Sequence, residues 1–116
     1  MKINEIAAAI SGKIISQNNN SNTDILYAYS SDLLSMVLKN AVSDMALITI
    51  QSNINAVAVC VLMESPLLIL AEGVKVDSKA LDKANEENVC IIESPLSAYA
   101  ISGILYSNNI LPSDMA

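Results

Sequence analysis

The stretch YSSDLLSMVL, residues 29–38, places three side chains with chemical potential next to one another. Ser30 and Ser31 supply hydroxyl groups, and Asp32 supplies a carboxylate. The chain contains no histidine, so a serine nucleophile has no imidazole base and the Ser-His-Asp triad is excluded. Two interpretations remain open. Either this loop grips a ligand, or Ser31 is the N-cap of a helix with Asp32 in its first turn, where a negative charge suits the helix dipole.

Further polar side chains follow the apolar stretches of the sequence, at the points where strands are expected to end. In a parallel sheet the loops after the strands gather at one edge, where ligands usually bind. A small polar pocket at this edge is therefore one hypothesis. The alternative is that each residue only caps its own helix, as serine, asparagine and aspartate commonly do. The candidate ligand-binding residues are Ser30, Ser31, Asp32, Gln51, Ser52, Asn53, Glu72, Gly73 and Ser94.

The three glycines are too far apart in the sequence for a phosphate-binding loop. A P-loop needs two glycines and a Lys-Ser/Thr pair, and a dinucleotide fingerprint needs closely spaced glycines after a strand. We expect Gly73 to supply a turn, and Gly103 to let the last helix pack closely on the sheet.

The two cysteines, Cys60 and Cys90, lie in apolar stretches, which predicts buried thiols and no disulfide. A reactive thiolate needs a cationic neighbour or a helix N-terminus, and neither cysteine has one nearby in the sequence. With two cysteines and no histidine, we also expect no metal site. These features predict a protein without cofactor and without enzymatic activity.

The composition limits the partners of the protein. The 116 residues suit a single domain, and 53% of them are hydrophobic. Six lysines, no arginine and twelve acidic residues give a net charge of −6, which repels phosphate backbones. The N-terminal residues are too polar for a signal peptide, and the apolar stretches are shorter than the roughly 20 residues of a membrane span. We expect a cytoplasmic protein that binds neither nucleic acid nor membranes.

Apolar patterning predicts an α/β fold. The runs 45–50, 66–71 and 89–93 are apolar at almost every position, as is typical of strands buried on both faces of a parallel sheet. Segments with helical spacing alternate with them, which implies right-handed βαβ crossovers. With shorter strands at 13–16 and 25–29, the predicted order is α-β-β-α-β-α-β-α-β-α. The prediction is a three-layer α/β sandwich with a mainly parallel five-stranded sheet, one domain over residues 1–110 and a loosely packed C-terminal tail at 111–116.

Tyr99 and Tyr106 are seven residues apart and share one face of the last predicted helix. They either fill the core with their hydroxyls at its rim or form a protein contact surface. The helices predicted at 54–64 and 96–107 are apolar on more than one face. A lone domain would expose this surface as a large apolar patch, and a two-fold dimer is the commonest cover. We predict a homodimer with Tyr99 and Tyr106 at its interface.

Four segments together resemble the DRTGG-domain family: YSSDLLSMVLKNA, MALITIQSNINAVAVCVL, PLLILAEGVKVDSKALDKANEENVCIIES and LSAYAISGILY. The resemblance extends over residues 2–107. It points to the small stand-alone members and to the N-terminal domain of HPr kinase/phosphorylase. Where the family has its Asp-Arg and Thr-Gly-Gly loops, this chain has Gln51-Ser52-Asn53 and Ala71-Glu72-Gly73.

The resemblance implies an α/β fold, a regulatory or accessory role and frequent self-association. Kinase activity in HPr kinase belongs to a separate P-loop domain, so the resemblance implies no kinase activity here. Two functions therefore follow as hypotheses. The first is a non-catalytic regulatory or protein-interaction module of the DRTGG type that self-associates. The alternative is a sensor that binds a nucleotide-like or other polar metabolite at the loop edge of the sheet.

Overall fold

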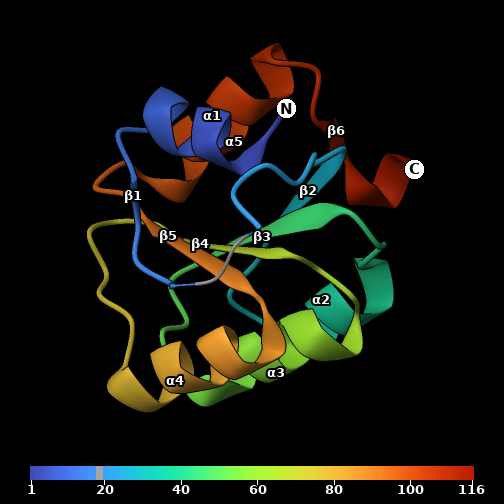
Figure 1. Cartoon of the computed structure of the whole chain (residues 1–116). Coiled ribbons are helices and arrows are strands. Elements are labelled where there is room, and N and C mark those ends of the chain that lie inside the picture. Colours follow the sequence, from blue (N-terminus) through green and yellow to red (C-terminus); the bar gives the residue numbers. More distant parts are fainter. Residues whose placement is uncertain (18–19) are drawn as a thin grey trace.

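The computed structural model describes residues 1–17 and 20–116, and these residues form a three-layer α/β sandwich (Figure 1). Within them, six strands make one sheet in the order β1-β5-β4-β3-β2-β6. The β1–β5 pairing is antiparallel and the other pairings are parallel. The sheet is thus mixed and has six strands in the described part of the chain, so the predicted number of five strands is wrong. The strands are β1 (Lys13–Ile14), β2 (Tyr27–Ser30), β3 (Met45–Thr49), β4 (Leu67–Leu70), β5 (Cys90–Glu93) and β6 (Leu111–Pro112).

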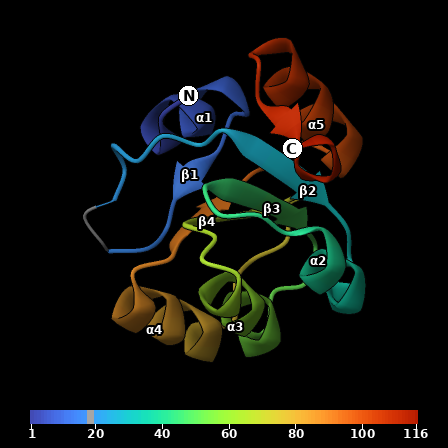
Figure 2. The same ribbon diagram turned by 90° about the vertical axis from the view of Figure 1, so that its right-hand side faces the viewer.

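The helices cover both faces of this sheet, as Figure 2 shows from the side. In the described part of the chain, two helices lie on one face and three lie on the other, so the predicted three layers are confirmed. The order of helices and strands up to the last helix also agrees with the prediction. The first pair is α1 (Ile3–Ala9) and α5 (Ala98–Ser107), and the other group is α2 (Leu34–Asn40), α3 (Ile54–Leu62) and α4 (Ser78–Glu87).

The three central strands are buried at almost every position, because helices cover them on both sides. Alternate residues of β3 enter different cores. Ile48 packs in the core under α1 and α5, whereas Leu47 packs in the core under α2, α3 and α4. This two-sided burial explains why these strands read as continuous apolar runs rather than as alternating ones.

The edge strand β1 is antiparallel because the chain reverses tightly after α1. Ser11 has a left-handed φ of 55°, and Gly12 lies close against β5. A Cβ added at Gly12 would lie only 2.5 Å from Cγ2 of Ile92. The absence of a side chain at Gly12 therefore allows this reversal to pack directly on the sheet.

The C-terminal residues are part of the sheet. Leu111–Pro112 forms β6, which pairs with Tyr27 and Ala28 of β2, and Ser113–Met115 forms the short 3₁₀-helix η1. Ser113 is buried at 3% exposure. The expectation of a loosely packed tail at residues 111–116 is therefore wrong. A strand of two residues carries no periodicity by which the sequence could reveal it.

None of the helices in the described part of the chain has the length and apolarity needed to cross a membrane.

Candidate functional site

Asp32, just after β2, holds the loop that follows β3. Its Oδ1 accepts hydrogen bonds from Thr49 Oγ1 at 3.0 Å and from the backbone N–H of Ile50 at 2.9 Å. The backbone carbonyl of Asp32 accepts another from Gln51 Nε2 at 3.0 Å. The predicted loops after β2 and β3 therefore lie side by side, and the hydrogen bonds of the Asp32 carboxylate join them.

Ser31 lies before the start of α2 rather than at its N-cap. Leu33 occupies the N-cap position, and its backbone N–H donates to Ser31 Oγ at 3.1 Å. The helix starts later than expected because Asp32 bonds to the neighbouring loop and does not enter the first turn. The predicted cap at Ser31 and the predicted place of Asp32 in the helix are both wrong.

Asn53 is the N-cap of α3, as predicted: its Oδ1 accepts a hydrogen bond from the N–H of Asn55 at 3.0 Å. Ser52 is fastened to the start of α4. Its hydroxyl donates to Asp77 Oδ1 at 3.4 Å, and its carbonyl accepts from the N–H of Asp77 at 3.0 Å. Both residues therefore hold helix starts in place.

Glu72, Gly73 and Ser94 form a second group, after β4 and β5. Glu72 and Gly73 are exposed, and Gly73 supplies the predicted turn with a left-handed φ of 74°. Ser94 is only 1% exposed. Its hydroxyl donates to the carbonyl of Ile10 at 2.7 Å and accepts from the N–H of Leu96 at 3.2 Å. Ser94 thus connects the end of α1 to the end of β5, and its expected place in a surface pocket is wrong.

The nine candidate residues consequently lie in two groups, one after β2 and β3 and the other after β4 and β5. The contact between Ser52 and Asp77 joins the loop after β3 to the loop after β4. In both groups the polar side chains named above bond mainly to nearby loops. Ser30 differs, because it is exposed at the end of β2 and lines a groove that the sequence did not predict.

This groove has a volume of about 690 Å³ and lies between α5 and the C-terminal segment. Its floor is the end of β2, including Ser30. One wall is α5, and the other is β6 with η1. We call it the α5 groove; residues that define it are Ser30, Tyr99, Gly103, Tyr106, Leu111 and Asp114.

Tyr99 and Tyr106 both line the α5 groove, so they share a face of the helix as the sequence predicted. They are 90% and 62% exposed and do not fill the core. Gly103, between them, is also exposed, and a Cβ added there would meet no atom within 4 Å. The expectation that Gly103 packs closely on the sheet is therefore wrong; the missing side chain deepens the groove instead.

The α5 groove could not be predicted from the sequence, for one reason. Its second wall consists of residues that we expected to be a loose tail. Leu111 and Pro112 are apolar residues that follow the polar pair Asn108-Asn109. This change in polarity is the one sequence feature that indicates that the segment packs against the domain.

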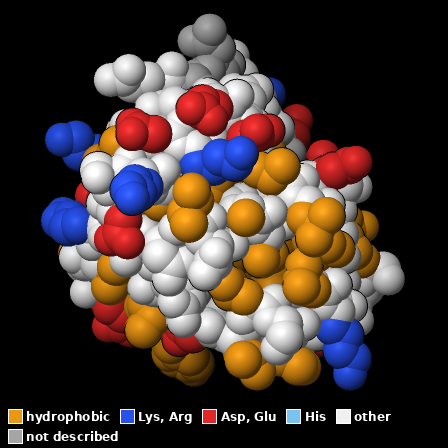
Figure 3. Space-filling view, turned by 90° about the horizontal axis from the view of Figure 1, so that it is seen from below, with side chains coloured by type: hydrophobic (Ala, Val, Ile, Leu, Met, Phe, Trp, Pro, Cys, Tyr) orange, Lys and Arg blue, Asp and Glu red, His pale blue; other side chains and the backbone are white. Residues whose placement is uncertain are grey.

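A second exposed apolar surface lies on the opposite face of the sandwich. It is formed by side chains of α2, α3 and the N-cap of α2, with exposures between 37% and 70%. Figure 3 shows apolar side chains gathered on one side of this face, while most charged side chains in the view lie on the other. We call this surface the α2–α3 patch; it comprises Leu33, Met36, Leu38, Ile54 and Leu62.

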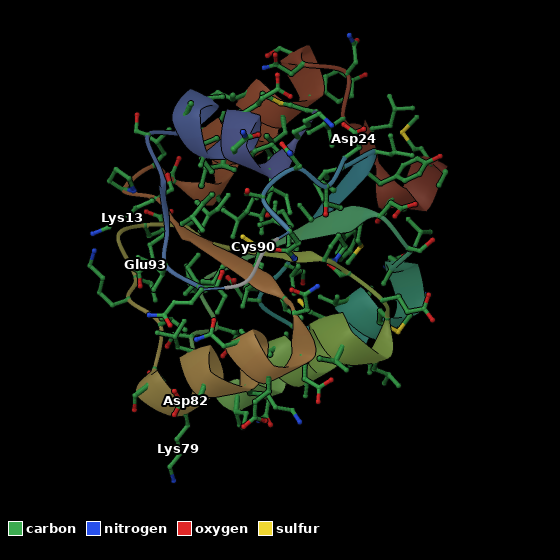
Figure 4. The ribbon with its side chains drawn as sticks, in the orientation of Figure 1. Lys13, Asp24, Lys79, Asp82, Cys90 and Glu93 are labelled. Atoms are coloured by element: carbon green, nitrogen blue, oxygen red, sulfur yellow. The ribbon has the colours of Figure 1, made fainter. Side chains whose placement is uncertain are left out.

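Both cysteine thiols are buried and free, as predicted. Desolvation by burial raises the pKa of Cys60 to about 12, although a hydrogen bond with Ser65 opposes it slightly. Burial also raises the pKa of Cys90, which Figure 4 places within the sheet. Such thiols stay protonated at neutral pH and are poor nucleophiles.

The acidic residues hold loops or face solvent. Glu93 accepts a hydrogen bond from the N–H of Val76 at 2.8 Å and lies 3.5 Å from Lys75 Nζ. Asp82 is exposed on α4, and Lys79 of the same helix points away from the protein (Figure 4). Among residues 1–17 and 20–116, no cluster of three or more His, Cys, Asp or Glu is arranged to hold a metal ion.

No protein-family model and no curated protein sequence matches this chain. A solved structure does: the CBS and DRTGG domains of the regulatory region of Clostridium perfringens pyrophosphatase, in complex with the activator diadenosine tetraphosphate. The TM-score is 0.67 at 14% sequence identity. The match covers 98% of this chain and 49% of the other, so this chain spans about half the length of that structure. The α/β fold described above is therefore similar to that of a CBS and DRTGG domain region.

Proposed function

We propose that this chain is a non-catalytic regulatory module of the DRTGG type, which acts in the cytoplasm through protein interaction and self-associates. The fold likeness to a regulatory region and the sequence resemblance to the DRTGG family both support the regulatory role. The buried thiols, and the carboxylates of Asp32 and Glu93 that bond to neighbouring loops, support a role without catalysis.

The observation that carries the self-association is the α2–α3 patch. Its five large apolar side chains are exposed together, and such patches mark interaction sites on soluble proteins. A second copy of the chain suits this surface electrostatically. Each copy has a net charge of −6, and most charged side chains in Figure 3 lie away from the patch. Two copies can therefore meet there without bringing their carboxylates together.

The test compares two double variants by analytical ultracentrifugation. Leu33→Lys with Leu62→Lys places two charges in the α2–α3 patch, where the native side chains are 61% and 70% exposed. Tyr99→Lys with Tyr106→Lys makes the same change in charge at the interface predicted from the sequence. We expect the parent to be a dimer and the first variant to be a monomer. A monomeric parent would overturn the proposal, and dissociation by the tyrosine variant alone would move the interface to α5.

The second candidate function is a small-molecule sensor. The fold neighbour was solved with a nucleotide activator bound, which makes a regulatory ligand a reasonable hypothesis for this chain. The α5 groove favours it more than the loop edge does, because Asp32, Ser52 and Ser94 at that edge already bond to neighbouring groups of the protein. Thermal-shift measurements across polar metabolites test it: a ligand at about 100 times its dissociation constant stabilises the protein by about 2.7 kcal/mol.

A further inference from the structure

The α5 groove has the dimensions and lining of a small-molecule site. Its volume of about 690 Å³ falls within the roughly 300–1,000 Å³ usual for ligand pockets. Such pockets have mostly apolar walls and a few polar groups that orient the ligand. Here α5, the end of β2 and the β6–η1 segment enclose the space on three sides.

The end of β2 offers an open pair of backbone groups to this space. The N–H of Ser31 donates to the carbonyl of Ile48 on β3 at 3.1 Å. Because successive residues of a strand direct their N–H and C=O groups to opposite sides, those of Ser30 point away from β3. On that side, β6 pairs with β2 only at Tyr27 and Ala28 among the described residues. Ser30 therefore presents one donor and one acceptor, side by side, to the floor of the groove.

The α5 wall favours a flat ligand. Gly103 leaves an open position on the helix surface, where an added Cβ would meet nothing within 4 Å. Tyr99 and Tyr106 stand on either side of it along the helix and place aromatic rings at the groove. Aromatic rings pair favourably by offset stacking or edge-to-face contact. A planar ring fits this wall better than a branched apolar group does.

The charges at the groove disfavour the binding of a ligand that carries a phosphate group. Asp114 is the one charged residue among the described residues that line it, and none of them is a lysine. The net charge of −6 acts in the same direction. A phosphorylated ligand would find a carboxylate and no cation to neutralise it.

We propose that the α5 groove binds an uncharged heteroaromatic molecule of the nucleobase or nucleoside class. The ring lies against α5 at Gly103, and its adjacent donor and acceptor pair with the backbone of Ser30. This inference rests on the second function proposed above and names its ligand class and its site. It does not require self-association, which is carried by a different surface.

Two pairs of variants test the site. Gly103→Leu fills the open position on α5, and Ala58→Leu, at an exposed position of α3 on the other face of the sheet, is its matched control. Ser30→Pro removes the proposed backbone donor, and Ser30→Ala keeps it. Binding of adenosine, guanosine, inosine, cytidine, uridine and their 5′-monophosphates is followed by ¹H–¹⁵N NMR and calorimetry, with circular dichroism to confirm folding.

We expect at least one nucleoside to bind and to shift the amide signals of Gly103 and its neighbours. Its 5′-monophosphate should bind at least tenfold more weakly. Gly103→Leu and Ser30→Pro should each weaken binding at least tenfold, and Ala58→Leu and Ser30→Ala should leave it within twofold. Should Ser30→Pro fail to fold, Gly103→Leu still decides the location of the site.

Three results would each overturn the inference: no nucleoside binds at millimolar concentration, a monophosphate binds as tightly as its nucleoside, or Gly103→Leu binds like the parent. The same titration on the Leu33→Lys, Leu62→Lys variant separates the two proposals. A monomer that still binds the nucleoside supports the site whatever the outcome for the dimer. If the parent protein dimerises but binds no nucleoside, the proposed sensor function is overturned and the proposed protein-interaction function stands.

Discussion

The carboxylate of Asp32 and the hydroxyl of Thr49 are joined by a hydrogen bond of 3.0 Å that connects the end of β2 to the end of β3. Thr49 is 1% exposed, so its hydroxyl has no access to solvent in the folded state. Asp32→Ala should lower the free energy of unfolding by about 1–3 kcal/mol, because it leaves a buried donor unpaired.

Urea denaturation measures this loss, and two further variants identify its cause. Asp32→Asn retains an oxygen acceptor and should cost less than Asp32→Ala. Thr49→Val removes the hydroxyl, so Asp32→Ala should cost less in that background than in the parent. Additive effects of the two substitutions would contradict a direct interaction.

The same substitution should have opposite effects at two glycines. Gly12→Ala should destabilise the protein by about 1–3 kcal/mol, since its Cβ would collide with Ile92. Gly103→Ala should stabilise it by about 0.5–1 kcal/mol, because the position is in open space within a helix. Thermal unfolding of both variants gives the signs. A lower melting temperature for Gly103→Ala would show that this position is packed, contrary to the structure.

Ser94→Ala should lower the free energy of unfolding by about 1–3 kcal/mol. The buried hydroxyl bonds to two backbone groups, those of Ile10 and Leu96, and both would lose a partner. Ser102→Ala is the matched control, because that hydroxyl bonds only to the carbonyl of Ala98 within the same helix. We expect less than about 0.5 kcal/mol for the control. Equal losses in both variants would contradict the role assigned to Ser94.

Cys60 should make stability depend on pH in the alkaline range. Its folded-state pKa is raised from 9.0 to about 12. A pKa raised by folding adds stability that is complete below the unfolded-state pKa and disappears as the pH rises toward the folded-state value. Between these values the loss is about 1.4 kcal/mol per pH unit. Cys60→Ala should show a shallower decline between pH 9 and pH 10.5 than the parent in urea denaturation, whereas identical slopes would contradict the burial of a neutral thiol.

The central strands could be predicted because a strand that is buried on both faces has apolar residues at almost every position. The runs at 45–50, 66–71 and 89–93 correspond to β3, β4 and β5, which no polar face interrupts. The N-cap at Asn53 could also be predicted, because it depends on a local contact: the side chain accepts a hydrogen bond from the N–H of Asn55, two residues later.

Two other features could not be predicted, because they depend on contacts between segments distant in sequence. Asp32 and Thr49 are 17 residues apart, and only the folded sheet shows that the aspartate bonds there instead of entering α2. The α5 groove likewise needs β6, a strand of two residues whose place is set by pairing with β2. Local propensity carries no information about such partners.

The attachment of both ends of the chain to one short segment has a mechanical consequence. The N–H of Ile25 donates to the carbonyl of Met1 at 2.8 Å, and the carbonyl of Leu26 accepts from the N–H of Leu111 at 3.2 Å. Tension applied between the first and last residues would therefore act first on these neighbouring contacts and detach α1 and β6 by peeling. The central strands β3, β4 and β5 would bear little load until both had separated, so the domain should extend in two steps of unequal force.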